Sequence, residues 1–335
     1  MAGIIFSEGS GVNDSVFGKC QMPIKMFIEK KAEAFENQTV CNLIFKESTS
    51  KKFGERVTSM TSMHGFQPVG EGGAYPKDEM QEGFDKTFIH ETFKDSFAIT
   101  QEMVEDSVMM DLKKKPSAFL NGYYRTRELF GASMLGGAVS GKEKITFRGK
   151  SYDVTANDGL SLFNTAHISA TGDCADQSNK FTNAFSVDAL GRVESAMQDF
   201  KDDNGNILAV CPDTIIIPNI ASLKQAVFAA IGADKDPATA NNAFNYQFGR
   251  WNVIVWSYLN QFIGTGIEPW MLLDSNYNED YGTALWLDRV KLEIKSYIDN
   301  NTDDNVWNGR ARWSGGFNDW RGIAIGGVSS GTTLS

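Results

Sequence analysis

Hydrophobic residues follow a helical spacing most clearly after residue 100. Thr100 is a residue type that favours the N-cap of a helix, and apolar residues recur at helical spacing as far as residue 112. Pro116 has no N–H and disfavours helix at the residue before it, so we expect a break there. The spacing resumes at Phe119 and stops at Gly136-Gly137. This pattern predicts a short helix, a break and a long helix of about five turns.

The spacing changes to a period of two in residues 54–63 and again in residues 84–99. Alternation of this kind predicts two long strands, and the Gly-rich stretch 70–76 between them predicts a turn at the tip of a ribbon. A two-stranded ribbon is only marginally stable in water. No neighbouring segment offers an obvious third strand, so we expect the ribbon to lie on another chain as an assembly element.

The other segments complete an α+β pattern. Residues 1–22 form a polar arm with scattered apolar residues, and Pro23 begins a helix to about residue 37. Strands alternating with helices predict an α/β lobe over about 186–285. Further strands are expected in a hairpin at 144–148 and 151–154, in two long strands at 292–299 and 306–313, and in a short strand at 321–325.

Composition narrows the class of protein. A chain of 335 residues with 41% hydrophobic residues can hold more than one folded lobe. The formal charge of −10 argues against tight nucleic-acid binding, which requires a positive surface. The four cysteines lack metal-binding spacing, which favours free thiols in a reducing compartment. No apolar run approaches the ~20 residues that a membrane-spanning helix needs.

Three motifs suggest chemistry, and each lacks a required part. Residues 136–142 have the spacing of a phosphate-binding loop, but Glu143 stands where a Ser or Thr would bind Mg²⁺. The stretch 202–206 is similar to a calcium-binding loop, but Phe200 stands at the first acidic position. The histidines are isolated from one another and from Cys or acidic partners at metal-binding spacing; they are His64, His90 and His167. We therefore predict no catalytic residue, cofactor or metal.

Several short sequence motifs resemble those of a known family. They are Phe97-Ala98-Ile99-Thr100-Gln101-Glu102, the stretch from Asp158 to His167, Asp213-Thr214-Ile215-Ile216-Ile217-Pro218, Trp270-Met271-Leu272-Leu273 and Asp319-Trp320-Arg321-Gly322-Ile323-Ala324. In this order they resemble the major capsid proteins of tailed bacteriophages, which have the Hong Kong ninety-seven fold. The amino-acid sequences of these motifs are most similar to those of Mu-like head subunits. The resemblance covers nearly the whole chain.

The resemblance implies a division of the chain into the parts of that fold. Residues 1–53 would be the N-arm, 54–99 the extended E-loop, 100–185 and 286–317 the P-domain with its spine helix, 186–285 the A-domain, and 318–335 the final A-domain strand and the tail. The chain departs from this pattern in that a long N-terminal scaffolding-like segment is absent, so we expect any scaffolding to come from a separate protein. The covalent Lys–Asn cross-link of some relatives is not assigned to any residue here.

The resemblance implies a structural function. The chain would self-assemble as hexamers and pentamers into an icosahedral head that encloses double-stranded DNA without reading its sequence. Portal, scaffolding and decoration proteins would be partners, the host cytoplasm the place of assembly and the virion the final location. The alternatives are an encapsulin-like compartment shell, another phage structural component such as a tail protein, and an enzyme or nucleotide-binding protein.

Charged and aromatic residues on the predicted ribbon, helix and long strands are candidates for contacts between subunits. Arg125 and Arg127 are assigned to the helix face that is open to partners. The full set of predicted assembly residues is Arg56, Glu71, Tyr75, Lys77, Asp78, Lys86, Arg125, Arg127, Arg310, Arg312 and Trp313.

Overall fold

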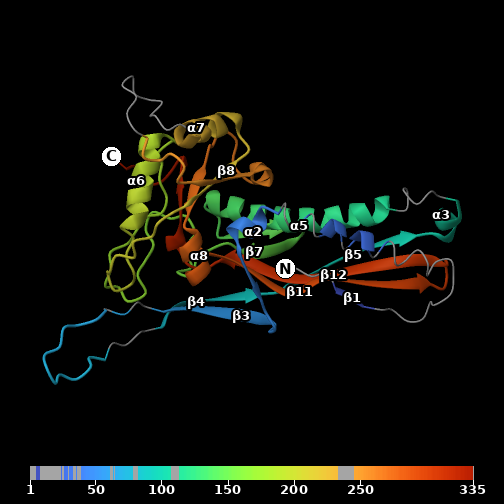
Figure 1. Ribbon diagram of the computed structural model, residues 1–335, viewed down its shortest axis with the longest axis horizontal. Helices are drawn as coiled ribbons and strands as arrows, with labels where there is room; N and C mark the ends of the chain where they lie inside the picture. Colours follow the sequence, from blue (N-terminus) through green and yellow to red (C-terminus); the bar gives the residue numbers. More distant parts are fainter. Residues whose placement is uncertain are drawn as a thin grey trace.

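A long mixed sheet with an antiparallel centre runs through the middle of the molecule (Figure 1). Strands β11 (Ala284–Asp299) and β12 (Asp304–Phe317) form its centre, and β5 (Glu91–Ile99) flanks β12. Strands β1 (Ile5–Ser7) and β2 (Lys46–Thr49) pair in parallel with different stretches of β11. The computed structural model describes residues 5–7, 24, 26–28, 30–32, 35, 39–60, 63, 65–77, 82–106, 113–232 and 245–334.

Helix α5 (Lys114–Val139) lies along one face of this sheet and is longer than predicted, at 26 residues (Figure 1). The predicted break between the two helices is present at Lys113, which belongs to neither helix, but Pro116 itself lies within α5. Pro116 occupies the first turn, where helical N–H groups have no intrahelical acceptor and the missing donor costs nothing. The end expected at Gly136-Gly137 is wrong. A Cβ on Gly137 would lie 2.2 Å from Ile145 Cγ2, so this glycine allows close packing inside the helix.

The short helix before it is α3 (Gln101–Asp106), and its predicted cap is confirmed. Thr100 Oγ1 accepts a hydrogen bond from the Met103 N–H at 3.3 Å. Val108 and Leu112, which the helical spacing included, lie outside the described residues. The described positions between 24 and 35 are helical, in agreement with the helix predicted after Pro23.

The predicted ribbon is divided between two sheets. Strand β3 (Gly54–Met60) pairs with β4 (Glu82–Ile89), and these two strands project from the body of the molecule (Figure 1). After His90 the chain enters β5, which pairs with β12 instead. The predicted ribbon of two strands reaching residue 99 is therefore wrong. Its return strand finds a sheet partner more than 200 residues later in the chain, which local spacing does not reveal.

The α/β lobe contains the second sheet, in the order β13-β10-β8-β9. Its strands are β8 (Thr214–Pro218), β9 (Asn252–Trp256), β10 (Trp270–Leu273) and β13 (Ile323–Gly326). The helices of the lobe are α6 (Val187–Gln198), α7 (Ala221–Gly232) and α8 (Ser275–Tyr281). Strands β8 and β10 are fully buried, which explains their uninterrupted apolar sequences.

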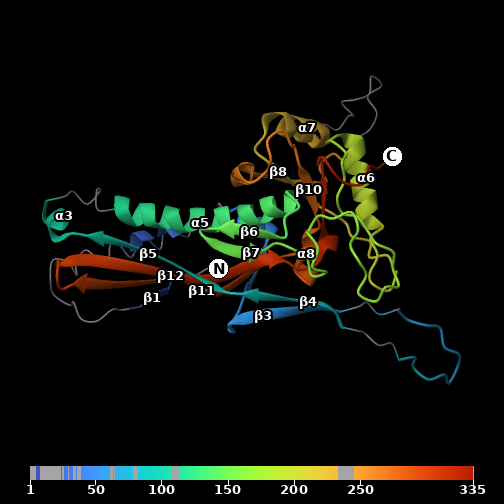
Figure 2. The ribbon, with the colours of Figure 1, turned by 180° about the vertical axis from the view of Figure 1, so that it is seen from behind.

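Aromatic side chains fill the space between α5 and the long sheet. The Phe130 ring packs edge-on against Trp286, with ring centroids 5.6 Å apart, and Trp313 stacks on Phe93 at 3.9 Å. The predicted hairpin is confirmed as β6 (Lys144–Phe147) and β7 (Lys150–Asp153), which lies beside α5 (Figure 2). Helix α2 (Cys41–Ile44) packs on the C-terminal half of α5, where Cys41 lies beside Glu128 and Gly131.

Candidate assembly surfaces

The tip between β3 and β4 exposes large apolar side chains. Phe66 is 110% exposed and Tyr75 is 95% exposed relative to a reference residue. Of the predicted assembly residues here, Glu71, Tyr75 and Lys77 are exposed, and Asp78 lies outside the described residues. The described tip residues lie in turn and irregular backbone, beyond the paired strands. An exposed aromatic pair on an unpaired tip is a surface that a partner can cover.

The paired part of the ribbon is held to the body of the molecule by a buried lysine. The side chain of Lys86 is 8% exposed, and its Nζ donates to the Thr155 carbonyl, to Thr155 Oγ1 at 3.2 Å and to Asp153 Oδ1 at 3.4 Å. Burial lowers the pKa of Lys86, against the charge of Asp153. The predicted contact of Lys86 with another subunit is wrong, because its amine is used within the chain. Arg56 stays exposed beside Asp85 at 2.9 Å.

Arg127 is buried inside the molecule. Its Nη1 donates to Asp288 Oδ1 and Oδ2 at 3.0 and 3.2 Å, and its Nη2 donates to Glu47 at 2.6 Å. The guanidinium carbon lies 4.5 Å from the centroid of the Trp286 ring. The prediction that Arg127 faces partners is therefore wrong. Trp313, 1% exposed, is also a core residue, and only Arg125 of the two predicted helix arginines faces solvent.

Glu128 joins three elements at the opposite side of α5. Its Oε1 accepts from the Cys41 N–H at 3.0 Å, and its Oε2 accepts from Trp256 Nε1 at 2.7 Å. Burial raises the pKa of Glu128, against the two hydrogen bonds that favour the carboxylate. The side chain thus connects α2, the long helix and the end of β9. Sequence reasoning missed this role, because Cys41 and Trp256 are 87 and 128 residues away in the chain.

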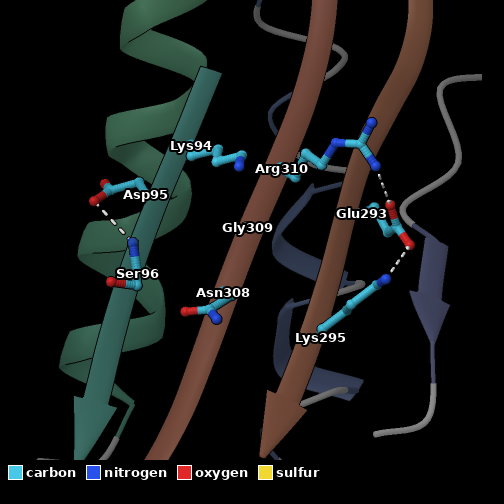
Figure 3. Close-up of a pocket in the computed structure, with 8 residues that line it drawn as sticks. All are labelled: Lys94, Asp95, Ser96, Glu293, Lys295, Asn308, Gly309 and Arg310. Atoms are coloured by element: carbon cyan, nitrogen blue, oxygen red, sulfur yellow. Dashed lines mark hydrogen bonds and ion pairs between the residues drawn. The ribbon is translucent and has the colours of Figure 1, made fainter. Parts of the chain in front are cut away.

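The sheet face opposite α5 carries a hollow of about 530 Å³ lined by charged side chains (Figure 3). Glu293 lies 3.6 Å from Arg310 and 3.4 Å from Lys295, while Lys94 extends toward Arg310 from the neighbouring strand (Figure 3). The two cations are partly exposed and Glu293 is 18% exposed, and ion pairs open to solvent contribute little to folding stability, about 0–1 kcal/mol each. Arg310 and Arg312 lie two residues apart on β12 and are both partly exposed, and their contacts with another subunit stay a prediction.

One buried cluster has side chains of the kind found in enzymes. His167 Nδ1 lies 2.6 Å from Asp158 Oδ2, its Nε2 lies 3.2 Å from Asn179 Oδ1, and its ring stacks on Trp320 with centroids 4.3 Å apart. Both ring nitrogens have partners and the side chain is fully enclosed. The arrangement connects the loop after β7 to the short 3-10 helix η2 (Trp320–Gly322), which directly precedes β13.

The described part of the chain contains no group of three or more His, Cys, Asp or Glu side chains placed to hold a metal ion. Among the described helices, none is both long enough and apolar enough to cross a membrane. Cys41, Cys174 and Cys211 are free thiols.

Comparison with known proteins identifies the family. The family described as phage capsid protein matches residues 85–326, more than two thirds of the chain. This protein belongs to the phage capsid protein family. A solved structure described as "Mycobacterium phage Patience" supports the fold, although only 12% of the residues are identical: the TM-score is 0.52, and the match covers 99% of this chain and 94% of that one. No curated protein sequence matches the chain.

A second solved structure, described as "Capsid of native GTA particle computed with C5 symmetry", has the same fold with a TM-score of 0.50 and 12% identity. That match covers 87% of this chain and 90% of the other. The phage capsid protein described here therefore has the α+β Hong Kong ninety-seven fold, and it is a structural major capsid protein that associates with itself in the virion shell. The closer resemblance to Mu-like subunits stays a prediction.

Proposed function

We propose that this capsid protein assembles as hexamers and pentamers into a closed icosahedral head around double-stranded DNA. Closed symmetry lets one chain build a large container from repeated contacts and requires no catalytic group. The formal charge of −10 is compatible with an inner wall that encloses DNA without binding it tightly. Portal, scaffolding and decoration proteins are the partners of this process, which takes place in the host cytoplasm.

The exposed ribbon tip is the observation that carries this proposal. Phe66 and Tyr75 leave almost their entire side chains in water, far from the apolar core of their own chain. Covering them on a neighbour removes apolar surface from water at about 25 cal/mol per Å², which favours association over the free subunit. The parts of the fold then act as the N-arm (1–53), the E-loop (54–99 with its return strand in the sheet), the P-domain and the A-domain.

Deletion of Gly70–Pro76 tests the proposal. The deleted subunit is expected to fold, with an unchanged circular dichroism spectrum, but to form no particles by electron microscopy. A control replaces the same stretch with a Gly/Ser segment of equal length. This variant removes the side chains but keeps the length of the ribbon, so it distinguishes the two effects of the deletion. Normal particles from the deleted subunit would contradict the role of the ribbon.

The alternative functions differ in simple measurements. A compartment shell would enclose a co-expressed enzyme in place of DNA, which nuclease protection distinguishes. A nucleotide-binding protein would show a raised melting temperature with ATP and Mg²⁺. The family match favours the phage head over both.

A further inference from the structure

A buried histidine joins the segment after the β6–β7 hairpin to the end of the chain. His167 pairs with Gln177 in an isolated antiparallel bridge, so the chain folds back between them. Lys180 then forms a parallel bridge to Ile325 of β13. Residues 158–181, which we call the return segment, therefore rest on the last strand of the second sheet. The side chain of His167 is fully enclosed at this junction.

The amide of Asn179 has a single possible orientation in the junction. Its nitrogen, Nδ2, faces three backbone carbonyl oxygens, which accept hydrogen bonds and cannot donate them. These oxygens belong to Leu162 at 2.8 Å, Ile323 at 3.1 Å and Trp320 at 3.3 Å. The amide oxygen, Oδ1, accepts from the Asn164 N–H at 3.0 Å. Exchanging the two amide atoms would break all of these bonds, so the atom that lies 3.2 Å from His167 Nε2 is an acceptor.

The other ring nitrogen of His167 also faces an acceptor. Nδ1 lies 2.6 Å from Oδ2 of Asp158, whose second oxygen accepts from the Leu160 N–H at 3.0 Å. A neutral imidazole has one N–H and one lone pair, so it can donate to only one of its two acceptors, whereas the imidazolium has two N–H groups and satisfies both. If the proton of the short bond lies nearer to Oδ2, the carboxyl group donates it, and the pair still holds the same number of protons.

The charges around the pair favour this extra proton. Of the three side chains that hydrogen-bond to His167 or stack on it in the described residues, Asp158 alone titrates. The stacked ring, Trp320, also contacts the guanidinium of Arg321, whose carbon lies 4.9 Å from the ring centroid. This second cation has two carboxylate partners of its own, Asp203 at 3.0 Å and Asp319 at 3.4 Å. The charge that faces His167 directly is therefore negative, and it favours the imidazolium.

We propose that His167 is a proton-dependent latch that holds the return segment on β13. With the proton bound, the two ring nitrogens donate to Asp158 and Asn179, and the junction is closed. Without it, an enclosed lone pair of the ring faces an enclosed acceptor, and a buried polar contact of this kind is costly. Water does not relieve it, because the side chains of both His167 and Asp158 are fully enclosed. The junction therefore loosens as the pH rises. This property belongs to the folded subunit and does not depend on the proposed shell assembly.

Urea unfolding of the unassembled subunit at a series of pH values tests the latch. Above about pH 7 a free histidine is mostly neutral and a free aspartate is ionised, so the folded chain holds one proton more at this pair than the unfolded chain does. Relative to His167→Gln, the ratio of unfolded to folded wild-type protein should rise about tenfold per pH unit, the equivalent of about 1.4 kcal/mol. Parallel pH profiles of the wild type and His167→Gln would overturn the proposal.

Two further variants distinguish the latch from a merely structural contact. Asp158→Asn can donate an N–H to the lone pair of Nδ1, so a neutral His167 satisfies both contacts. The subunit should then stay folded and lose the excess pH dependence. His90→Gln is the matched control, because burial and the nearby Arg289 and Arg312 lower the pKa of His90, and this variant should keep the wild-type profile. An unchanged excess in Asp158→Asn, or its loss in His90→Gln, would refute the assignment to His167.

Hydrogen exchange of the wild-type subunit tests the latch without any substitution. Peptides that cover 158–181 and 323–326 should lose protection between about pH 7 and about pH 9. Peptides of α5 serve as the internal reference, because the chemical rate of exchange changes with pH throughout the chain. Equal changes in the two sets of peptides would contradict the proposal.

Discussion

Replacing Arg127 with methionine should destabilise the subunit more than any surface change on the same helix. Methionine is of similar length and occupies the apolar surroundings, but it removes the charge. Asp288, which is 4% exposed, would then have no cation beside it. Its carboxylate would keep the hydrogen bond from Trp286 Nε1 at 3.0 Å. The perturbation therefore isolates the cost of an uncompensated buried carboxylate.

The structure indicates the size of the effect. Arg127 donates two hydrogen bonds to Asp288 at 3.0 and 3.2 Å, both within the buried interior. Burial by itself would lower the pKa of Arg127, but the neighbouring Tyr123 and Asp288 outweigh it and raise the pKa, so the charged form is favoured in the fold. Breaking such a pair from one side costs about 3–5 kcal/mol. The bond to Glu47 adds less, because that side chain is 32% exposed.

Urea unfolding of the unassembled subunit, followed by tryptophan fluorescence, measures this free energy. Arg125→Met is the matched control, since Arg125 is exposed two residues away, and it should change stability by less than about 0.5 kcal/mol. The double variant Arg127→Met with Asp288→Leu should cost less than the sum of the single changes, with a coupling of about 0.5–3 kcal/mol. Equal stability of Arg127→Met and Arg125→Met would refute the argument.

Three further predictions concern the same helix and the buried histidine. Burial raises the pKa of Glu128 in the folded state, so the folded protein binds a proton at this carboxyl more readily than the unfolded chain does. The stability that this proton contributes is lost as the pH rises through the pKa that Glu128 has in the folded state. Glu128→Gln should abolish this pH dependence of the free energy of unfolding in urea titrations. Gly137→Ala should destabilise by about 1–3 kcal/mol through its contact with Ile145, whereas Gly122→Ala should stabilise by up to about 1 kcal/mol; the same sign in thermal melts would contradict the packing argument. His167→Ala should cost about 3 kcal/mol or more, because it leaves Asp158 buried without its partner; a smaller loss in urea would show that the pair is dispensable.

Local pattern was sufficient for many elements of this capsid protein. The helix cap at Thr100, the hairpin around Gly149 and the buried strand 214–218 follow from signals within a few residues, because caps, turns and side-chain alternation depend on nearby backbone. The order of these elements and the family phrases were enough to predict the fold and the capsid family. Neither required knowledge of distant contacts.

Other assignments depended on partners that are distant in sequence. The helical spacing places Arg127 on the polar face of its helix, which predicts exposure to solvent. The ion pair with Asp288, 161 residues later in the chain, allows this arginine to be buried instead. Residues 91–99 have the spacing of a ribbon strand, but pairing with β12 decides which sheet they join.

The hollow between α5 and β5, with Arg148 at its rim, could be anticipated only in part. The Arg-Gly turn at residues 148–149 is an unusual choice for a two-residue hairpin and was a signal available in the sequence. The empty space at Gly122 could not be predicted from the sequence. A glycine within a helix does not by itself reveal whether neighbouring atoms fill the space beside it. The sequence by itself determined the elements, their order and the family of this protein. Only the tertiary structure decided which charges are buried and which surfaces stay open, because burial depends on packing between segments that the chain brings together from far apart.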